Sequence, residues 1–183
     1  RQGGFDAARS VIWKNSDRFK VRGLAHHNFA WITQGAVDLL ESFSRQDQPF
    51  FLYVASTALH GPHHADSLEP DPRNTQGGRV EDVMEYRAPV NEIRQRLDGL
   101  SRYEQYKAAG LAELDHQVGM VLDTLARLGL EDDTLFIFMS DHGIEPAKAT
   151  CYQLGVHVPA VVRWPGHVPP GSVSDALVQN IDI

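Results

Sequence analysis

The sequence contains very little cysteine and no long apolar run. Its single cysteine, Cys151, excludes an internal disulfide and a zinc site built from several cysteines. Nothing around Cys151 marks a cysteine–histidine catalytic arrangement, so we expect a small, partly buried apolar side chain. The longest wholly apolar run, residues 50–55, is too short to cross a bilayer, and no membrane span is expected.

Clustered positive charge is also missing. The chain carries 17 Lys and Arg residues against 24 Asp and Glu residues, for a formal net charge of -7. Without a run of cations to neutralise phosphates, nucleic acid is not an expected partner. The length of 183 residues, 42% of them hydrophobic, suits one globular domain with a sizeable core. No signal peptide is visible and Arg1 is not an initiator Met, so we expect both ends to be cuts in a longer protein.

Two segments show the apolar spacing of helices. From residue 31 to residue 44, apolar side chains recur at helical intervals and predict a helix. A second helix is predicted over residues 103–128, where one apolar stripe contains Leu111, Leu114, Val118, Val121, Leu122, Leu125 and Leu128. Gly129 favours the end of this helix, because glycine accepts the left-handed conformation that often follows one.

Three short apolar runs predict strands. Residues 50–55 and 134–139 are expected to be buried strands, and residues 159–164 a third strand. Together with the helices they predict an α/β fold, a sheet sandwiched by helices, whose ligands gather at the carboxyl ends of the strands. Residues 57–100 hold many prolines, glycines and histidines without clear regular structure, so we expect a functional or mobile loop that shapes a cleft.

Candidate metal ligands follow the second predicted strand. Asp141 supplies a hard oxygen, His142 supplies an imidazole nitrogen, and Gly143 lets the backbone turn sharply. A carboxylate directly after a buried strand needs a cation or hydrogen-bond donors to offset its desolvation. Asp141 could instead simply cap the loop, which is a common role for aspartate. Two adjacent ligands cannot complete a metal shell, so further ligands must come from elsewhere.

Other candidate binding residues lie near the ends of the predicted strands. Lys148 is either a solvated surface lysine or a cation that grips an anionic substrate group. His60 follows the first predicted strand, where a lone histidine is more often a surface residue than a catalyst. Its neighbours His63 and His64 favour an anion or metal environment around it.

The order of these blocks is informative. Residues 49–54 read PFFLYV and lead to His60-Gly61-Pro62, and residues 135–143 read LFIFMSDHG. Residues 106–119 form the helical block before that strand, and residues 148–166 form the block after it. This succession resembles the sulfatase family of the alkaline phosphatase superfamily, whose patterns are P-F-F-L-Y, A-P-H-x-P and S-D-[HN]-G. The likeness covers most of residues 31–183, and the segment over residues 148–159 looks closest to sulfamidase-like and related bacterial sulfatases.

The resemblance implies a partial catalytic domain over residues 1–183, with an incomplete, mixed but mostly parallel sheet. Asp141 and His142 would bind a divalent metal, in the first place Ca²⁺, although the softer imidazole leaves Mn²⁺ and Zn²⁺ open. Lys148 would contact a sulfate oxygen, and His60 would donate a hydrogen bond to the sulfate or to the leaving oxygen. A sulfated small molecule or glycan would be the substrate, and a periplasmic, secreted or lysosome-like location is implied.

The chain also departs from the family pattern. Leu59 stands where the family often has proline, and the C/S-x-P-x-R motif that yields the formylglycine nucleophile is absent. Cys151 cannot replace it, because Tyr152 and Gln153 follow. The aspartates that complete the metal shell and an upstream lysine–histidine pair are missing as well. We therefore expect no turnover from this chain, and a sulfuric ester or sulfamate hydrolase as its intact parent.

Two further hypotheses stay open from the sequence. His142 is typical of superfamily relatives that act on phosphoryl groups, so the parent could be a phosphodiester or phosphonate hydrolase. The third hypothesis is a catalytically inert segment with a structural or binding role.

Overall fold

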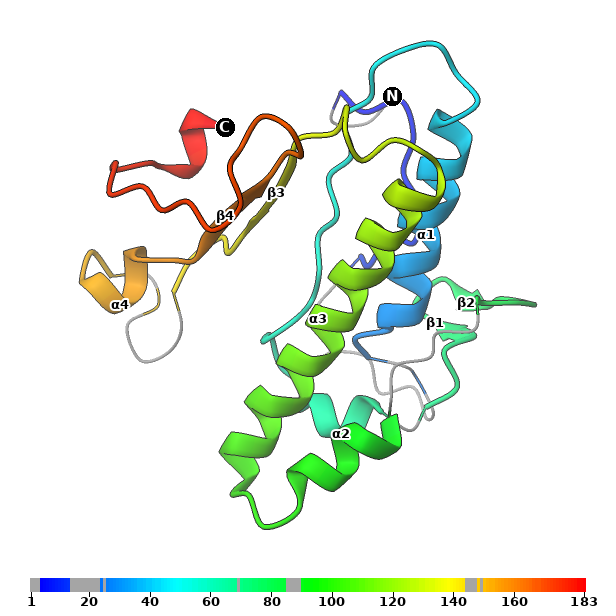
Figure 1. Cartoon of the computed structure of the whole chain (residues 1–183). Helices are drawn as coiled ribbons and strands as arrows, with labels where there is room; N and C mark the ends of the chain where they lie inside the picture. The colour runs from blue at the N-terminus through cyan, green and yellow to red at the C-terminus, as the bar shows by residue number, and fades with distance from the viewer. Residues whose placement is uncertain are drawn as a thin grey trace. The chain divides into compact units, whose positions relative to one another are not determined.

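The chain forms two compact units, Arg1–Thr124 and Leu125–Ile183. The computed structural model describes residues 4–13, 24, 26–68, 70–84, 90–143, 148 and 150–183. The first unit contains α1 (Phe29–Phe43), the 3-10 helix η2 (His64–Ser67), β1 (Asn74–Thr75), β2 (Gly78–Arg79), α2 (Val90–Leu97) and most of α3 (Arg102–Arg127) (Figure 1). The second contains β3 (Phe136–Met139), α4 (Gln153–Val156), β4 (Ala160–Arg163) and the 3-10 helix η3 (Asn180–Asp182).

The two long helices of the first unit confirm the predictions over residues 31–44 and 103–128. Asn28 caps α1, because its Oδ1 accepts the backbone N–H of Trp31 at 3.2 Å. A buried hydrogen bond of 3.2 Å, donated by Gln117 Nε2 to Thr33 Oγ1, joins α3 to α1. Figure 1 accordingly shows α1 and α3 side by side.

The end of α3 lies where the sequence predicted it. Gly129 has a φ of 69°, and its N–H donates to the Ala126 carbonyl at 3.0 Å. The N–H of Leu130 donates to the Leu125 carbonyl at 2.9 Å, which completes a Schellman ending.

The apolar stripe predicted for α3 is only partly buried. Val121 and Leu125 are 6% and 2% exposed, whereas Leu111 is 50% exposed. Small and polar residues, among them Ala109 and Gln117, occupy much of the buried face instead. Helical periodicity located the helix, but the packing partner decides which of its faces is covered.

Residues 50–55, predicted as a buried strand, belong to no strand in the described structure. Exposure alternates along the segment, and Phe51 is 74% exposed. Aromatic stacking holds it: the Phe50 ring lies 5.1 Å from that of Phe43, and the Phe51 ring 6.2 Å from that of Phe5, between centroids. The prediction is wrong here because a strand needs a neighbouring strand for its backbone hydrogen bonds, and no described segment supplies one.

Residues 57–100 contain more regular structure than the sequence indicated. Besides η2, they include a short antiparallel hairpin in which Asn74 pairs with Arg79 and Thr75 with Gly78. The helix α2 packs on α3 through a cluster of buried residues, Ile93, Leu97 and Ala109. The expectation of a loop without regular structure is therefore wrong for these parts of the segment.

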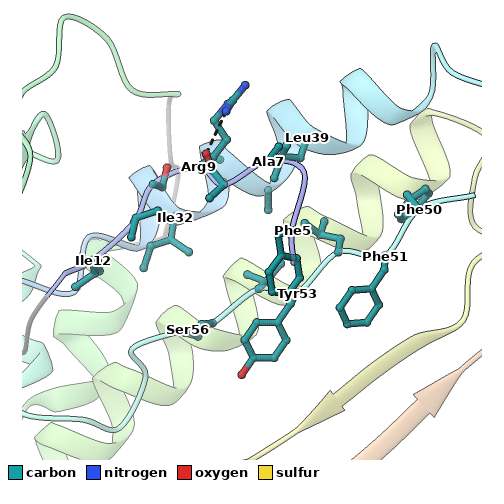
Figure 2. A pocket seen from close by; sticks show the side chains of 18 of the residues that line it. Phe5, Ala7, Arg9, Ile12, Ile32, Leu39, Phe50, Phe51, Tyr53 and Ser56 are labelled. Atoms are coloured by element: carbon teal, nitrogen blue, oxygen red, sulfur yellow. Dashed lines mark hydrogen bonds between the residues drawn. The ribbon is translucent and has the colours of Figure 1, made fainter. Parts of the chain in front are cut away.

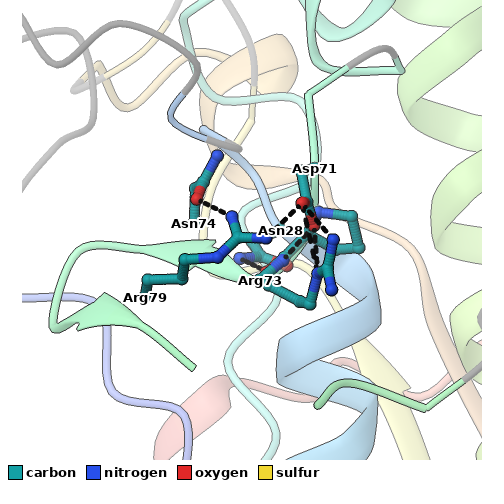
Figure 3. Close-up of polar contacts among 6 residues, drawn as sticks. Asn28, Asp71, Arg73, Asn74 and Arg79 are labelled. Carbon is teal, nitrogen blue, oxygen red and sulfur yellow. Dashed lines mark hydrogen bonds and ion pairs between the residues drawn. The ribbon is translucent and has the colours of Figure 1, made fainter. Parts of the chain in front are cut away.

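One carboxylate organises the hairpin, as Figure 3 shows. Asp71 Oδ2 accepts from the guanidinium of Arg73 at 2.8 Å and from that of Arg79 at 3.0 Å. The hydrogen bonds from Arg73 hold the pKa of Asp71 well below its usual range, so this carboxylate stays ionised. Asn28 Nδ2 donates to the Pro72 carbonyl at 2.8 Å, which ties the hairpin to the start of α1.

In the second unit, β3 and β4 confirm the strands predicted at residues 134–139 and 159–164. They pair antiparallel, with Phe136 opposite Arg163 and Met139 opposite Ala160. The expected burial of the first of these strands is not found, because all four residues of β3 are only half-buried. Helices and small sheets agree with an α/β protein, and within the described residues both sheets are two-stranded and antiparallel.

The structure bears on the burial expected of Cys151 and on membrane-spanning helices. Cys151 is exposed rather than partly buried, because it lies in the exposed stretch that leads into α4. Among the described residues, no helix combines the length and the apolar character needed to cross a membrane.

Candidate functional site

The turn after β3, residues 140–143, brings two candidate ligand atoms together. Asp141 Oδ2 and His142 Nε2 lie 3.4 Å apart, and the two side chains are 80% and 43% exposed, respectively. His142 Nδ1 lies 2.6 Å from the Gly143 carbonyl, which can only accept a hydrogen bond. The imidazole therefore donates through Nδ1, and Nε2 faces the carboxylate. We call residues 140–143 the Asp141 turn.

The Asp141 turn depends on Gly143. Its N–H donates to the Gly155 carbonyl at 2.9 Å, so the turn is tied directly to α4. A Cβ at position 143 would lie 1.8 Å from the Leu154 carbonyl oxygen, closer than any real contact. The other end is held by the N–H of Ser140, which donates to the Pro159 carbonyl at 3.3 Å. Only glycine fits this close approach of two backbones.

The donor set of the Asp141 turn suits part of a metal shell. One carboxylate oxygen and one imidazole nitrogen, both accessible, are ligands that a divalent cation accepts. Among the residues that the structure describes, no group of three or more His, Cys, Asp or Glu side chains converges. Asp141 and His142 could therefore supply two ligands of such a shell.

Lys148 is placed in the same unit as the Asp141 turn. It is exposed and lies in a turn, between residues 144–147 and 149, which are outside the described part. Of the four predicted site residues, the structure brings Asp141 and His142 together. Lys148 belongs to the same unit, and His60 belongs to the first unit.

His60 is exposed in a tight turn, residues 57–62, which we call the His60 turn. Its backbone N–H donates to the Thr57 carbonyl at 3.2 Å, and its Nδ1 lies 2.9 Å from the Gly61 carbonyl. Because that carbonyl only accepts, Nδ1 is the donor, and Nε2 is the other polar atom of the ring. The ring is thus oriented by its own backbone and presents one nitrogen for hydrogen bonding.

Two buried histidines lie behind the His60 turn. His27 and His64 are each 1% exposed, and their rings stack with centroids 3.7 Å apart. Burial lowers the pKa of His27 to about 4 and that of His64 to about 3, so both are neutral near neutral pH. His64 therefore does not supply the anion or metal environment expected of it, because it is a buried, neutral ring that serves the backbone.

No local pattern in the sequence indicates that these side chains support the His60 turn. His27 lies 30 residues before Thr57, whose hydroxyl is 3.1 Å from His27 Nδ1, and no local pattern links them. Tyr106, far along the chain in α3, donates its hydroxyl to the Leu59 carbonyl at 2.6 Å. The one local signal is Gly110, a glycine inside a helix, which usually marks a close approach.

A hollow of about 1060 Å³ in the first unit borders the His60 turn. Figure 2 shows the apolar and aromatic side chains that line it, among them Phe5, Ile32, Leu39, Phe50 and Tyr53. Gly35 lets residues 9 and 10 cross α1 closely, since a Cβ there would lie 2.6 Å from Ser10 Oγ. His60 belongs to the same lining, so it sits between an apolar hollow and solvent.

Comparison with known families settles the relationship of the chain. The sequence model of the family described as Sulfatase matches residues 3–183. This chain belongs to the sulfatase family. The family assignment made from the strand and turn motifs is thereby confirmed.

Individual sulfatases match over most of this chain. Human arylsulfatase A is 31% identical over 162 residues, which cover 81% of this chain and 26% of the relative. Mouse N-acetylgalactosamine-6-sulfatase is 30% identical over 166 residues, which cover 82% of this chain and 26% of the relative. An endo-4-O-sulfatase of Bacteroides thetaiotaomicron is 28% identical over 144 residues, which cover 74% of this chain and 27% of the relative. The chain therefore spans about a quarter of the length of these sulfatases.

A solved structure supports the sulfatase fold. The crystal structure of Ps i-CgsB in complex with k-i-k-neocarrahexaose matches with a TM-score of 0.56 at 23% identity, covering 76% of this chain and 28% of that one. At this identity the match speaks for the fold alone. None of the three relatives named above is a sulfamidase, so the finer likeness to sulfamidases stays a prediction.

Proposed function

We propose that the intact protein containing this chain hydrolyses sulfuric esters, with Asp141 and His142 as metal ligands and with His60 and Lys148 on the sulfate. The observation that carries the proposal is the Asp141 turn. In a chain of the sulfatase family, a carboxylate oxygen and an imidazole nitrogen converge to 3.4 Å in an accessible turn. Asp141 Oδ1 also accepts the backbone N–H of His142 at 2.9 Å, as a loop cap does, while Oδ2 remains beside the imidazole.

Each residue would act on charge that shifts during the reaction. A bound divalent cation would polarise the sulfuryl oxygens as a Lewis acid. Lys148 would hold a sulfate oxygen, and its ammonium group would offset negative charge there. His60 would form a hydrogen bond through Nε2 to the sulfate or to the leaving oxygen, provided that this nitrogen carries a proton when the substrate is bound. The nucleophile would be a formylglycine outside the residues printed here.

The metal is proposed to be Ca²⁺, with Mn²⁺ and Zn²⁺ as the other candidates. Asp141 suits the hard Ca²⁺ ion, whereas the imidazole of His142 also suits softer transition metals. The imidazole of His142 leaves one alternative function open, the hydrolysis of a phosphodiester or phosphonate by the same scaffold. The two functions are distinguished by the ester that the intact protein cleaves faster, a sulfate ester or a phosphodiester.

The substrate is proposed to be a sulfated glycan or a sulfated small molecule. The names of the relatives include an arylsulfatase, an N-acetylgalactosamine-6-sulfatase and an endo-4-O-sulfatase. We also propose that the intact domain contains the mixed, mostly parallel sheet that the family resemblance implies.

The test compares the intact protein with its Asp141→Asn variant. We expect cleavage of 4-nitrophenyl sulfate by the parent, and a loss of both bound metal and activity by roughly a hundredfold or more in the variant, because a ligand charge is removed. Asp133→Asn, at an exposed acid of the same unit, is the matched control and should change neither.

Metal content is measured by inductively coupled plasma mass spectrometry and activity by release of nitrophenol. Faster cleavage of a phosphodiester than of the sulfate would favour the alternative function. A parent that carries its formylglycine and still cleaves neither ester would refute the proposal.

A further inference from the structure

The backbone of Leu59, the residue before His60, is held on both sides by side chains. Its φ of 58° lies in the left-handed region, which branched side chains rarely adopt. Its N–H donates to His64 Nε2 at 2.9 Å, and its carbonyl accepts the Tyr106 hydroxyl at 2.6 Å. An unfavourable conformation at this position therefore persists because two side chains, His64 nearby in the chain and Tyr106 in α3, fix the peptide groups around it.

We propose that His64, together with Tyr106, is a positioning residue that sets the orientation of His60 toward the substrate. The inference rests on the role proposed above for His60. His64 acts through the backbone, since its ring is 1% exposed and its Nε2 accepts the Leu59 amide.

The ring of His64 is itself fixed by its surroundings. It stacks on His27 at 3.7 Å between ring centroids, and it fills the space that Gly110 leaves open on α3. A Cβ at position 110 would lie 2.8 Å from His64 Cδ2, so a larger residue there would displace the ring. The histidine is therefore held in one plane, with Nε2 aimed at the Leu59 amide.

His27 extends the same support to both ends of the His60 turn. Its Nε2 donates to the Pro62 carbonyl at 2.8 Å, and its Nδ1 lies 3.1 Å from Thr57 Oγ1, whose hydroxyl donates to the His27 carbonyl at 3.2 Å. The two stacked imidazoles thus hold the peptides on either side of His60. A planar, uncharged ring with one donor or acceptor on each edge suits this task better than a flexible amide side chain.

The protonation states agree with this arrangement. Nε2 of His64 can accept the Leu59 amide only while it carries no proton, and burial, reinforced by neighbouring His27, His63 and His60, lowers the pKa of His64 to about 3. Burial also raises the pKa of Tyr106, so its hydroxyl remains a donor. The support is therefore intact over the whole neutral range.

A double-mutant cycle in the intact protein tests the proposal. His64→Leu removes the acceptor and should lower kcat/KM for 4-nitrophenyl sulfate by roughly tenfold to a hundredfold, because a buried N–H loses its partner and His60 turns away. In a His60→Ala background the same change should cost less than about twofold, since His64 acts only through His60. His64→Gln, whose amide oxygen can accept the Leu59 N–H, should recover part of the activity.

Two tyrosines of α3 provide the matched pair of variants. Tyr106→Phe deletes the hydroxyl that holds the Leu59 carbonyl and should reproduce part of the loss. Tyr103→Phe, an exposed tyrosine on the same helix, should leave kcat/KM unchanged. Equal losses of kcat/KM from His64→Leu in the parent and in the His60→Ala background would overturn the proposal. Full activity of His64→Leu would overturn it as well.

Hydrogen exchange separates this proposal from the proposed function. Amide exchange of the peptide over residues 57–62, followed by mass spectrometry, should accelerate in His64→Leu and stay as in the parent in Tyr103→Phe. Unchanged exchange in His64→Leu would overturn the positioning role, whatever the activity. A parent without sulfatase activity would instead overturn the function of His60, while accelerated exchange would still establish that His64 holds the turn.

Discussion

Lys148 is the predicted site residue whose role depends on charge alone. It is exposed, and no aromatic or carboxylate partner is assigned to it in the described structure. We expect Lys148→Ala in the intact protein to lose about 2–4 kcal/mol of transition-state stabilisation, or roughly 30-fold to 1,000-fold in kcat/KM, as one aimed charge at an active site would. The assay is initial-rate kinetics with an aryl sulfate.

The control for this variant is Lys107→Ala. Lys107 lies over the Tyr103 ring at 4.4 Å from the centroid and is not a proposed site residue, so its loss should not change the rate. An unchanged rate for Lys148→Ala would remove this lysine from the site.

At the residue scale, the sequence predicted a site made of adjacent residues but not an arrangement made of residues far apart in the chain. Asp141 and His142 are neighbours in the chain, so their convergence could be expected from the motif alone. The pair of His27 and His64 comes from segments separated by 37 residues (64 minus 27), and its burial depends on Gly110 from a third segment. Such an arrangement is a property of packing, and a one-dimensional pattern does not contain it.

At the scale of elements, the Asp141 turn and α4 form one structural piece. The link is the N–H of Gly143 on the Gly155 carbonyl, together with the contact between Gly143 and Leu154. We expect Gly143→Ala to force the turn away from α4 and to abolish metal binding by the intact protein, because the Asp141 and His142 donors would no longer converge. Calorimetric titration with Ca²⁺ measures the loss.

Gly166→Ala is the comparison for this variant. Gly166 has a left-handed φ of 76°, but no atom lies within 4 Å of its missing Cβ, so only a modest loss of stability is expected and Ca²⁺ binding should persist. Normal Ca²⁺ affinity in Gly143→Ala would show that the turn does not need α4.

Elements differed in how well the sequence predicted them. Periodicity over three or more turns located α1 and α3, and short apolar runs located β3 and β4. The hairpin at residues 74–79 escaped notice because each strand has two residues, too few for any period. Residues 50–55 carry the pattern of a strand, yet their structure depends on a neighbour that the described residues do not provide.

At the scale of the whole molecule, the buried histidines make stability depend on pH. Burial lowers the pKa values of His27 and His64 to about 4 and about 3 from the usual 6.5, so the unfolded chain binds more protons below pH 6.5. Their contribution is complete above pH 6.5 and is lost as pH falls toward those folded-state values. We expect the free energy of unfolding to fall by up to about 1.4 kcal/mol per pH unit for each histidine between pH 6.5 and 4.

Urea unfolding of the intact protein at pH 7, 6 and 5, followed by tryptophan fluorescence, measures this slope. Hydrogen bonds from Arg73 and Ser101 lower the pKa values of Asp71 and Glu104, so both carboxylates stay ionised in the folded protein over this pH range. His64→Gln should reduce the slope, since only His27 would then remain. Equal stability at pH 7 and pH 5 would contradict the assignment of two buried, neutral histidines.

The spacing of Tyr106 and Gly110 along α3 has a consequence for sequence length. The two positions lie about one helical turn apart, so they face the His60 turn together. A single inserted or deleted residue between them would rotate one relative to the other by about 100°. The number of residues between Tyr106 and Gly110 is therefore constrained. We expect amino-acid replacements on the outer side of this helical turn to be tolerated, and insertions or deletions within it not to be.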